Sequence, residues 1–511
     1  MEKGSRLRFG RKGRGEGRGA GRIPVEGRGK GCKMDPLKLD AAARAMGAEV
    51  PAVEQCRITC TGASIDTRSL EPGHLFFALK GEKSDGHAHL EKAREGGAAA
   101  AVVRRGATFA RPRGLPLLVV DDPARALWDL AAHARARFQG TVVCITGSNG
   151  KTTTKEMAGA VAGTIGPCVR SEKSFNNHLG VPLSILRADA STRTLVLEVG
   201  TNRPGEIARL ARLAKPRIGV VTSIGEAHLG HFGSLRAIAE EKASLLAALP
   251  EDGFAVINAN DDFAPLLAAR TRARVCTFGR VEDTTDAAVL EDVDVWGTAV
   301  RRSSRPRGIC FWLYGKMKVT VPMQGLHNAS NALAAIAVGL LLGAEPLAVR
   351  DALRGVEPPR LRLQRERVGG VVLVDDSYNA NPASVGAALD ELASTACDGR
   401  RVLVLGDMGE LGDLSEEHHR RAGRRAASCA DVLWTVGPMA RAAAEAALAA
   451  GMPSDRVLGS PDAASAADAP PFEPEPGDVV LIKASRAVGL DRLARALRTR
   501  LAARSREREA V

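Results

Sequence analysis

The chain has 511 residues, of which 45% are hydrophobic and 26% are charged, as is ordinary for a soluble globular protein of roughly two to four domains. No apolar run reaches the roughly 18 residues that a membrane-spanning helix needs, which argues against membrane insertion. The formal net charge is +13, and such an excess of positive charge indicates an anionic partner.

The N-terminal segment, residues 1–33, carries much of this charge. It holds eleven Lys/Arg and three Asp/Glu and so contributes +8 of the total. Because it is rich in Gly and Arg and almost without apolar residues, we expect a disordered basic extension. It could act as an RNA-binding arm. We favour the alternative that translation starts at Met34, where a well-patterned segment begins, so no nucleic-acid partner is expected.

The cysteines indicate the cellular compartment. The nine cysteines are scattered from Cys32 to Cys429 without the paired spacing of a zinc site. Reduced, mostly structural thiols of this kind are typical of the cytoplasm. Residues 1–33 also lack the apolar stretch of a secretory signal, so we expect a cytoplasmic protein.

Residues 34–135 are predicted to form a small N-terminal α/β domain. Three apolar runs are typical of short strands between helices, at 75–79, 98–103 and 115–120. Asp66 and Arg68 are the polar candidates of this domain, although a turn with a surface ion pair is the simpler interpretation of the two side chains.

Residues 136–345 alternate between predicted strands and helices, which indicates a mostly parallel sheet with helices on both faces. Strands are expected at 141–145, 194–199, 217–223 and 254–258, and helices at 151–163, 204–213, 234–248 and 327–342. Residues 285–325 look like hairpin strands inserted late in this domain.

Residues 346–511 repeat the alternation and predict a C-terminal Rossmann-like α/β domain. Strands are expected at 370–374, 401–405, 431–436 and 478–482. Polar turns follow these strands, at the edge where open α/β sheets collect ligand residues. The stretch 461–477, rich in Ala, Pro, Asp and Glu, is interpreted as a surface loop, and 490–501 as a basic amphipathic helix with a solvated face.

The chain is organised around the stretch 141–157. A buried strand ends before Gly147 and a helix starts after Gly150, and this geometry cradles phosphate with backbone N–H groups and the helix N-terminus. Lys151 is placed to reach the β- and γ-phosphates of a nucleotide, and Thr152 to offer its hydroxyl to Mg²⁺. The glycines are separated by two residues instead of the usual four. A glycine turn that caps an ordinary helix is the alternative.

Three further polar residues stand out in the central domain. Glu198 ends a predicted strand at a position that suits Mg²⁺, although a capping or ion-paired carboxylate is equally consistent with it. His228 follows the next strand, where a lone histidine is usually structural or exposed. Lys242 lies on a predicted helix behind two acidic residues and, taken alone, is a salt-bridged surface residue.

Polar side chains also gather at the start of one helix and after two strands. Asn328 and Asn331 lie three residues apart on one helix face. Asparagine can pair with an adenine edge, while N-capping by Asn328 is the alternative. In the C-terminal domain, Asp375–Pro382 and Lys483–Arg486 each follow a predicted strand and offer groups suited to a carboxylate or a phosphate.

Taken together, these stretches resemble the Mur ligase family of peptidoglycan synthesis. The resemblance covers about residues 34–511. It rests on Thr146–Thr152, Asn176–Pro182, Leu197–Gly200, Ala227–His228, Glu241–Lys242, His327–Asn331, Arg362–Gln364 and Lys483–Ser485. Within the family, Asp376–Pro382 and Gly406–Gly412 are similar to the branch that adds D-Ala-D-Ala, since sister ligases and folylpolyglutamate synthases carry different residues at the first of these runs.

The resemblance implies an ATP-dependent amide ligase with a UDP-substrate-binding domain at 34–135, an ATP-binding central P-loop-type domain at 136–345 and a ligase domain at 346–511. The terminal carboxylate of UDP-N-acetylmuramoyl-tripeptide would become an acyl phosphate, and the amine of D-Ala-D-Ala would displace the phosphate. ATP and Mg²⁺ are the implied cofactors, and a monomer is expected.

The family's roles fall on individual residues of this chain. Lys151, Lys242 and His228 would be catalytic. Mg²⁺ would be held by Thr152, Glu198 and His228, and a carbamylated Lys242 would hold a second Mg²⁺. ATP would be bound by Gly147, Ser148, Asn149, Gly150, Lys151, Thr152, Thr153, Asn328, Asn331, Arg362 and Asp376. The other substrates would be bound by Ser64, Asp66, Arg68, Asn176, Asn177, Asn379, Asn381, Lys483 and Ser485.

Two residues depart from the family pattern. A glycine usually precedes the arginine at position 362, and here the residue is Leu361; a glycine usually stands between Lys483 and Ser485, and here it is Ala484. Both concern local backbone geometry rather than the reaction class.

The sequence is also consistent with two other functions: a sister ligase that adds a diamino acid, and a nucleotide-dependent protein that binds RNA through its basic tail.

Overall fold

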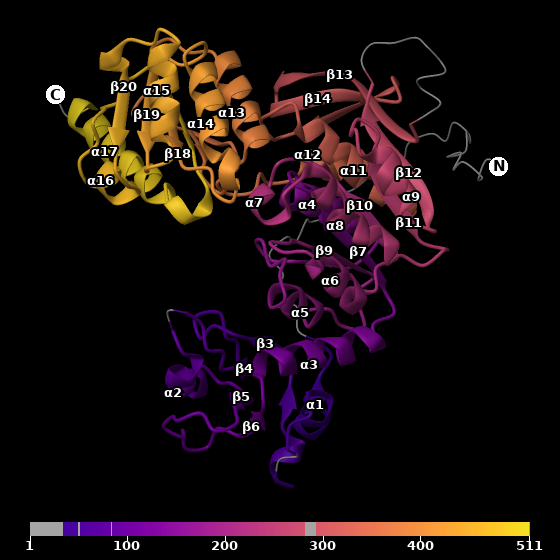
Figure 1. The fold of residues 1–511 in the computed structure, drawn as a ribbon. Helices are drawn as coiled ribbons and strands as arrows, with labels where there is room; N and C mark the ends of the chain where they lie inside the picture. Colours follow the sequence, from indigo (N-terminus) through magenta and orange to yellow (C-terminus); the bar gives the residue numbers. More distant parts are fainter. Residues whose placement is uncertain (1–33, 50–51, 83, 282–292, 510–511) are drawn as a thin grey trace.

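The computed structural model describes residues 34–49, 52–82, 84–281 and 293–509 and shows three α/β regions, with the central one between the other two (Figure 1). Each region is built on a sheet that is wholly or mostly parallel, so the predicted α/β fold class is confirmed. Within the described residues, no helix is long and apolar enough to cross a membrane. The predicted disordered extension at 1–33 and the first part of the predicted hairpin stretch lie outside the described residues.

The N-terminal region has a parallel four-stranded sheet of β3 (Gly62–Ser64), β4 (His74–Phe77), β5 (Ala100–Arg104) and β6 (Leu117–Val120). A short antiparallel pair, β1 (Leu37–Lys38) and β2 (Thr59–Cys60), lies beside it. Alternate residues of β4 face opposite sides: Leu75 and Phe77 share a core with α1 (Leu39–Met46) and α3 (Pro123–Arg137), and Phe76 packs with α2 (Leu90–Glu95).

The central sheet has nine described strands in the order β15-β14-β13-β12-β11-β10-β7-β9-β8. The four predicted strands are confirmed as β7 (Thr141–Thr146), β9 (Thr194–Glu198), β10 (Ile218–Val221) and β11 (Phe254–Asn258). The described part of the predicted hairpin stretch forms β13 (Val295–Ser304), β14 (Arg307–Leu313) and β15 (Met317–Val321). The prediction omitted β8 (Cys168–Arg170), which has only three residues, and β12 (Arg274–Arg280).

Helices cover both faces of the central sheet, as predicted. On one face, α4 (Lys151–Ala162), α11 (Asn328–Leu341) and α12 (Pro346–Arg354) pack on Val143 and Ile145 of β7. The opposite face carries α5 (Gly180–Ile185), α6 (Glu206–Ala214), α8 (Leu235–Ala247) and α9 (Ala264–Ala269). The chain leaves β7 for the β8 side and later returns to the β10 side. A crevice opens at such a switch of direction, so the sequence after β7 occupies a ligand position.

The C-terminal sheet has the order β16-β17-β21-β18-β19-β20, in which only the β16–β17 pair is antiparallel. Its strands are β16 (Gln364–Val368), β17 (Val371–Asp376), β18 (Arg401–Gly406), β19 (Val432–Val436), β20 (Val457–Ser460) and β21 (Val479–Lys483), and its helices include α13 (Pro382–Ser394), α14 (Ser415–Ala426) and α15 (Arg441–Ala449). Because β17 and β21 are parallel neighbours, their ends Asp376 and Lys483 lie in register at one edge.

Two predictions for this region need correction. The stretch 461–477 is not simply a surface loop: it contains α16 (Ala463–Asp468). Its residues Ala463, Ala466 and Ala467 are buried because their small side chains pack against α17 and the sheet. The last helix, α17 (Asp491–Glu509), is longer than predicted. It is amphipathic as expected, and Leu493 and Leu497 on its apolar side lie in the core of the C-terminal sheet.

Candidate active site

The glycine loop connects β7 to α4 in a conformation that only glycine fits. Gly147 and Gly150 have φ angles of 149° and 82°, in a region that disfavours residues with a side chain. A Cβ atom at Gly147 would lie 1.9 Å from Oγ1 of Thr222, and one at Gly150 would lie 2.2 Å from Oδ1 of Asn331. The predicted strand, glycine turn and helix are therefore all present, and close neighbours explain both glycines.

The segment after β10 fixes the path of this loop. The amide of Ser148 donates to the carbonyl of Ser223 (2.8 Å), and the Ser148 hydroxyl donates to the carbonyl of Gly225 (2.8 Å). The hydroxyl of Thr222 donates to the carbonyl of Asn149 (2.5 Å). A loop backbone held in this way is preorganised for an anion, because its N–H groups need no rearrangement to bind one.

Two cationic groups lie over the loop. The ammonium group of Lys151 donates to two loop carbonyls, at 2.7 and 3.3 Å. Burial lowers the pKa of Lys151; the charge of Glu198 opposes this shift, and that of Arg362 adds to it. The guanidinium of Arg362 donates from Nη2 to the hydroxyl of Thr152 (3.1 Å). The C-terminal region thus places an arginine against a residue of the glycine loop motif.

Glu198 ends β9 and offers an unpaired oxygen. The side chain is buried, and its Oε1 accepts a hydrogen bond from Nδ2 of Asn176 (2.8 Å). Its Oε2 is buried and has no hydrogen-bond partner in the described part of the chain. Since a buried carboxylate oxygen without a partner is costly, and hard cations prefer oxygen ligands, this atom fits a cation better than a purely structural role.

Lys242 lies on α8 and is only 2% exposed. The interpretation as a salt-bridged surface residue is wrong. Both oxygens of the adjacent Glu241 accept backbone amides, from Gly205 (2.7 Å) and Ile207 (2.9 Å), and Lys242 makes no ion pair among the described residues. Burial and the charge of Lys151 lower the pKa of Lys242 to about 7, so much of this lysine is a neutral amine at neutral pH.

His228 follows β10 and is held by the C-terminal region. Its backbone is left-handed, with φ of 62°, and its Nδ1 is in ion-pair contact with Oε2 of Glu410. A hydrogen bond from His228 lowers the pKa of Glu410, against the effect of burial. The imidazole is therefore mostly buried, and it is held by contacts from the central and the C-terminal regions together.

The two asparagines of α11 share one face, as predicted. Nδ2 of Asn331 donates to Oδ1 of Asn328 (2.7 Å), and Nδ2 of Asn328 donates to the carbonyl of Gln324 (2.6 Å). The N-cap position of the helix is His327, with no side-chain capping bond. N-capping by Asn328 is therefore wrong, because the amide of Asn328 donates backwards instead of accepting from the first turn.

The polar run after β17 reaches both its own sheet and the glycine loop. Lys483 donates to Oδ2 of Asp376 (2.6 Å) and to the carbonyl of Asn379 (2.9 Å). The side chain of Asn381 accepts the amide of Ser384 and so caps α13. Nδ2 of Asn381 also donates to Oδ1 of Asn149 (2.9 Å). The hydrogen bond between the side-chain amides of Asn381 and Asn149 joins the C-terminal region to the glycine loop of the central region.

Both departures from the family pattern have a local explanation. Leu361 adopts φ of 61°, which is the conformation that a glycine at this position would favour. Ala484 is fully buried and is accommodated because Gly406 lies opposite: a Cβ atom at Gly406 would lie 2.7 Å from Cβ of Ala484. The methyl group and the missing side chain therefore compensate each other.

One cavity of about 600 Å³ unites these elements. Of the residues predicted for the site, it is lined by Ser148, Asn149, Gly150, Lys151, Thr153, Asn176, Glu198, His228, Asn328, Asn331, Arg362, Asp376, Asn379, Asn381, Lys483 and Ser485. Gly147 and Thr152 are chain neighbours of lining residues. Lys242 is buried and close enough to the lining residue Lys151 for the charge of that lysine to affect its pKa.

Some predicted residues lie elsewhere or have another local role. Asp66 and Arg68 form an ion pair (2.6 Å) in the turn after β3, and Ser64 hydrogen-bonds to the backbone of Asp66. This group does not line the cavity. Oδ1 of Asn177 accepts the amides of Leu179 and Gly180 at the start of α5.

Among the cavity-lining residues that sequence reasoning missed, Arg280, Tyr378 and Glu410 carry charge or an aromatic ring. Arg280 ends β12, a strand that was not predicted. Tyr378 lies inside a recognised motif, and its ring carries the guanidinium of Arg362 at 4.4 Å. Glu410 also lies inside a recognised motif, but no local pattern pairs it with His228.

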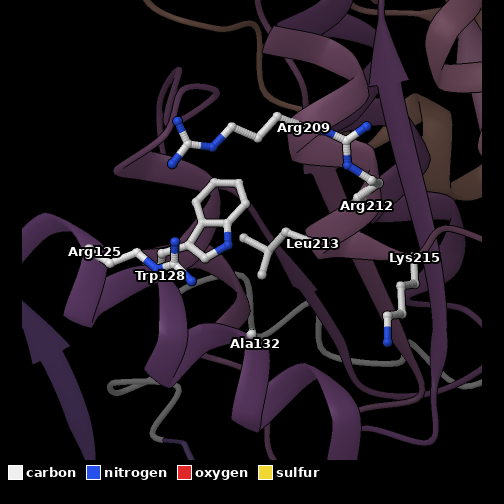
Figure 2. A pocket seen from close by; sticks show the side chains of 7 residues that line it. All are labelled: Arg125, Trp128, Ala132, Arg209, Arg212, Leu213 and Lys215. Atoms are coloured by element: carbon white, nitrogen blue, oxygen red, sulfur yellow. The ribbon is translucent and has the colours of Figure 1, made fainter. Parts of the chain in front are cut away.

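A second cavity, of about 280 Å³, lies between α3 and α6 (Figure 2). Arg209 covers the ring of Trp128 at 4.6 Å, and Arg135 donates to the carbonyls of Ala214 (2.6 Å) and Lys215 (2.8 Å) at the end of α6. These contacts join the N-terminal region to the central one. None of the predicted site residues lines this cavity.

Comparison with known protein families gives matches along the chain. Residues 145–339 match the Mur ligase middle domain, residues 360–486 the Mur ligase, glutamate ligase domain, and residues 59–135 the Mur ligase family, catalytic domain.

Two curated relatives carry the same name, UDP-N-acetylmuramoyl-tripeptide–D-alanyl-D-alanine ligase. That of Bacillus subtilis is 36% identical over 85% of this chain and 93% of the relative. That of Escherichia coli is 37% identical over 75% of this chain and 83% of the relative.

Solved structures agree with these matches. MurF from Acinetobacter baumannii superposes with a TM-score of 0.76 at 29% identity, over 91% of this chain and 99% of that one. MurF ligase from Thermotoga maritima in complex with ADP superposes with a TM-score of 0.70 at 27% identity, over 87% and 98%. With motifs, fold and relatives in agreement over most of its length, the chain belongs to the Mur ligase family.

Proposed function

We propose that this chain joins D-Ala-D-Ala to UDP-N-acetylmuramoyl-tripeptide, with conversion of ATP to ADP and phosphate, in the cytoplasm and as a monomer. The observation that carries the proposal is the single cavity in which a preorganised glycine loop meets the polar run after β17. Such a cavity can hold a nucleotide and an acceptor together. The names of the relatives supply the substrate pair.

In the proposal, ATP lies with its phosphates on the glycine loop. The N–H groups of the loop and the Lys151 ammonium offset the negative charge of the phosphates. Asn328 and Asn331 hold the adenine, because their amides offer both donors and acceptors. Arg362 and Asp376 complete the nucleotide site from the C-terminal region, since Arg362 already contacts Thr152.

The residues around Glu198 fit Mg²⁺. The buried Oε2 of Glu198 lacks a partner among the described residues, and the hydroxyl of Thr152 and the imidazole of His228 are further donors. No cluster of three or more His, Cys, Asp or Glu side chains occurs in the described part of the chain, which suits Mg²⁺, an ion that takes few protein ligands beside phosphate oxygens. Bound there, Mg²⁺ would neutralise charge on the β- and γ-phosphates.

Lys242 is proposed to be carbamylated. A neutral lysine amine adds to CO₂, a new N–C bond forms and one proton is released, so the buried neutral amine becomes a carbamate anion. The low pKa of Lys242, about 7, keeps enough neutral amine for this step. The anion would be able to hold a second Mg²⁺, and its negative charge would also remove the repulsion from Lys151.

The chemistry proceeds in two steps. A carboxylate oxygen of the tripeptide attacks the γ-phosphorus, the bond to the β-phosphate oxygen breaks, and ADP leaves. The amine nitrogen of D-Ala-D-Ala then attacks the acyl carbon, the carbon–oxygen bond to phosphate breaks, and phosphate leaves with the amine proton. Lys151 stabilises the charge that moves onto the bridging oxygen. Closure of the regions around the substrates would exclude water, which would protect the acyl phosphate.

The remaining residues are proposed to hold the two other substrates. From the C-terminal region, these would be Asn379, Asn381, Lys483 and Ser485. Asn176 and Asn177 would approach the tripeptide from the central region. Ser64, Asp66 and Arg68 would lie near the uridine diphosphate, where the arginine can meet a phosphate.

Phosphate release tests this proposal. The full chain is incubated with ATP, Mg²⁺ and UDP-N-acetylmuramoyl-tripeptide, with and without D-Ala-D-Ala. We expect release that requires the dipeptide and a pentapeptide product by mass. Lys151→Met should lower the rate by about 100-fold or more, because loss of one transition-state contact has that effect. Lys316→Met, at an exposed hairpin turn, is the matched control and should leave the rate unchanged.

The same assay separates the alternatives. Release with a diamino acid in place of D-Ala-D-Ala would assign the chain to a sister ligase. Release that needs added RNA, and is lost when residues 1–33 are deleted, would replace the ligase by a nucleotide-dependent RNA-binding protein. The ligase proposal expects this deletion to be without effect.

A further inference from the structure

A tight turn after β18 contacts the loop that carries His228. The amide of Gly230 donates to the carbonyl of Glu410 (2.9 Å), and the Glu410 carboxylate contacts Nδ1 of His228. The two segments are about 180 residues apart in sequence and follow strands of different sheets, β10 and β18. The contact therefore forms only when the central and C-terminal regions are packed together.

Glycine at two positions permits this approach. A Cβ atom at Gly230 would lie 2.8 Å from the backbone nitrogen of Gly412, and one at Gly412 would lie 3.0 Å from Cα of Gly230. Backbone atoms on the opposite side cannot turn away as a flexible side chain could. Gly230 itself does not have a positive φ, so an alanine would suit its own backbone and would obstruct only the contact.

The turn that presents Glu410 is rigidly held from its own side. The amide of Met408 donates to Nε2 of His419 (2.9 Å), and the amide of Gly409 donates to the hydroxyl of Ser485 (2.7 Å). Glu410 is itself left-handed, with φ of 63°, a conformation that persists only where the surroundings enforce it. The position of the Glu410 carboxylate is thus set by the C-terminal region.

We propose that Glu410 is a positioning residue, which orients His228 through Nδ1 when the C-terminal region packs on the central one. A carboxylate on one ring nitrogen fixes the ring orientation and leaves the other nitrogen free for a ligand. Packing of the two regions would then complete the cation site. The role of His228 at that site rests on the proposed function. The contact between Glu410 and His228 is independent of the proposed function.

The test uses the full chain and Mn²⁺ as a spectroscopic probe, with binding measured by electron paramagnetic resonance in the presence of ADP. Outer partners of metal ligands change metal affinity by about 10- to 100-fold, so we expect Glu410→Ala to weaken Mn²⁺ binding by about tenfold. In a His228→Ala background the same change should have no further effect. An equal loss in both backgrounds would overturn the proposal, because Glu410 would then not act through His228.

Gly230→Ala tests the packing contact without removing a charge. Small-angle scattering should show a larger radius of gyration than for the wild type, together with weaker Mn²⁺ binding. Gly386→Ala is the matched control, since a Cβ atom there meets nothing within 4 Å, and it should behave as the wild type. An unchanged radius and unchanged Mn²⁺ binding in Gly230→Ala would overturn the proposal.

Failure of this inference can be told apart from failure of the proposed function. If the wild type releases no phosphate with D-Ala-D-Ala while the Mn²⁺ pattern holds, the ligase proposal fails and the positioning role stands. Should phosphate release depend on D-Ala-D-Ala while Glu410→Ala binds Mn²⁺ like the wild type, the positioning role fails alone. Thermal unfolding of each variant identifies any that does not fold, and Glu410→Gln then replaces it.

Discussion

At the scale of single residues, Leu361 and Leu363 occupy backbone positions that disfavour large side chains. Their φ angles are 61° and 47°, and a left-handed conformation costs a residue with a Cβ atom roughly 1–2 kcal/mol. Leu363 is buried in the core of the C-terminal region, while Leu361 is partly exposed. The same backbone strain is therefore offset by hydrophobic burial at one position and much less so at the other.

This difference predicts opposite effects of glycine. Leu361→Gly should leave the free energy of unfolding unchanged or raise it by up to about 1 kcal/mol, because backbone strain is relieved. Leu363→Gly should lower it by about 2–4 kcal/mol, because a buried side chain is lost. Urea unfolding of both variants measures the difference, and a loss above about 1.5 kcal/mol for Leu361→Gly would contradict it.

The charge state of Lys242 should affect how the free energy of unfolding depends on pH. Its pKa is about 7 in the folded protein, against an ordinary value of 10.5. Between these two values the unfolded chain binds one more proton than the folded chain, so stability rises with pH. Below about pH 7 both states are protonated, and the folded state carries the full penalty of a buried cation.

We therefore expect Lys242→Met to be more stable than the wild type at neutral pH in CO₂-free buffer. The advantage should shrink by about 1.4 kcal/mol per pH unit above pH 7. Urea unfolding at a series of pH values measures it. A difference in unfolding free energy that does not vary with pH would show that the buried amine is not neutralised. Ligase activity of Lys242→Met should be lost, with partial recovery on adding short carboxylic acids.

At the scale of elements, the packing of α4 on α11 sets the distance between the glycine loop and the two asparagines. Gly339 on α11 faces Val161 on α4, and a Cβ atom at Gly339 would lie 2.2 Å from Cγ1 of Val161. The missing side chain lets the two helices approach closely. Asn331 lies about two helical turns before Gly339 on α11. This close approach brings it to α4, where the hydroxyl of Thr154 donates to its Oδ1 (3.3 Å).

Gly339→Ala should therefore destabilise the protein by about 1–3 kcal/mol, since overpacking a core has that cost. Combined with Val161→Ala, which removes the clashing methyl group, it should cost less than the sum of the two single changes. Urea unfolding of the three variants gives the coupling energy. A coupling near zero would mean that the two helices move apart freely. The apparent affinity for ATP should fall together with stability in Gly339→Ala.

At the scale of the whole molecule, one segment links the central and C-terminal regions between α12 and β16. Arg360 in this segment is exposed, and Arg362 beside it reaches the hydroxyl of Thr152. Residues on both sides of the segment line the cavity. A nucleotide held between the regions should therefore restrain the segment, because it binds groups from both of them.

Trypsin can detect this restraint. Cleavage after Arg360 should become several-fold slower when ADP and Mg²⁺ are added, because proteolysis requires local opening of the segment. Mass spectrometry of the fragments identifies the cut, and Arg360→Gln should abolish that fragment pair with or without nucleotide. Equal cleavage rates with and without ADP would contradict nucleotide binding across the two regions.

The exact domain boundaries near 135 and 345 remain predictions.

The sequence by itself determined the features that depend on neighbours in the chain. The strand, the glycine turn and the helix of 141–163 follow from a buried run, two glycines and a helical pattern. The shared face of Asn328 and Asn331 follows from helix periodicity. Strands of three residues, or those with exposed ends such as β8 and β12, escaped because their pattern is too short or too mixed.

Only the tertiary structure decided which distant residues meet and how they are solvated. Lys242 has the local sequence of a surface lysine, and its burial depends on how α8 packs against α6 and the central sheet. Arg362 contacts Thr152, which lies 210 residues earlier in the sequence. Glu410 of the C-terminal region contacts His228 of the central region. Local pattern fixes periodicity and turns, whereas burial and long-range contacts depend on how whole elements pack.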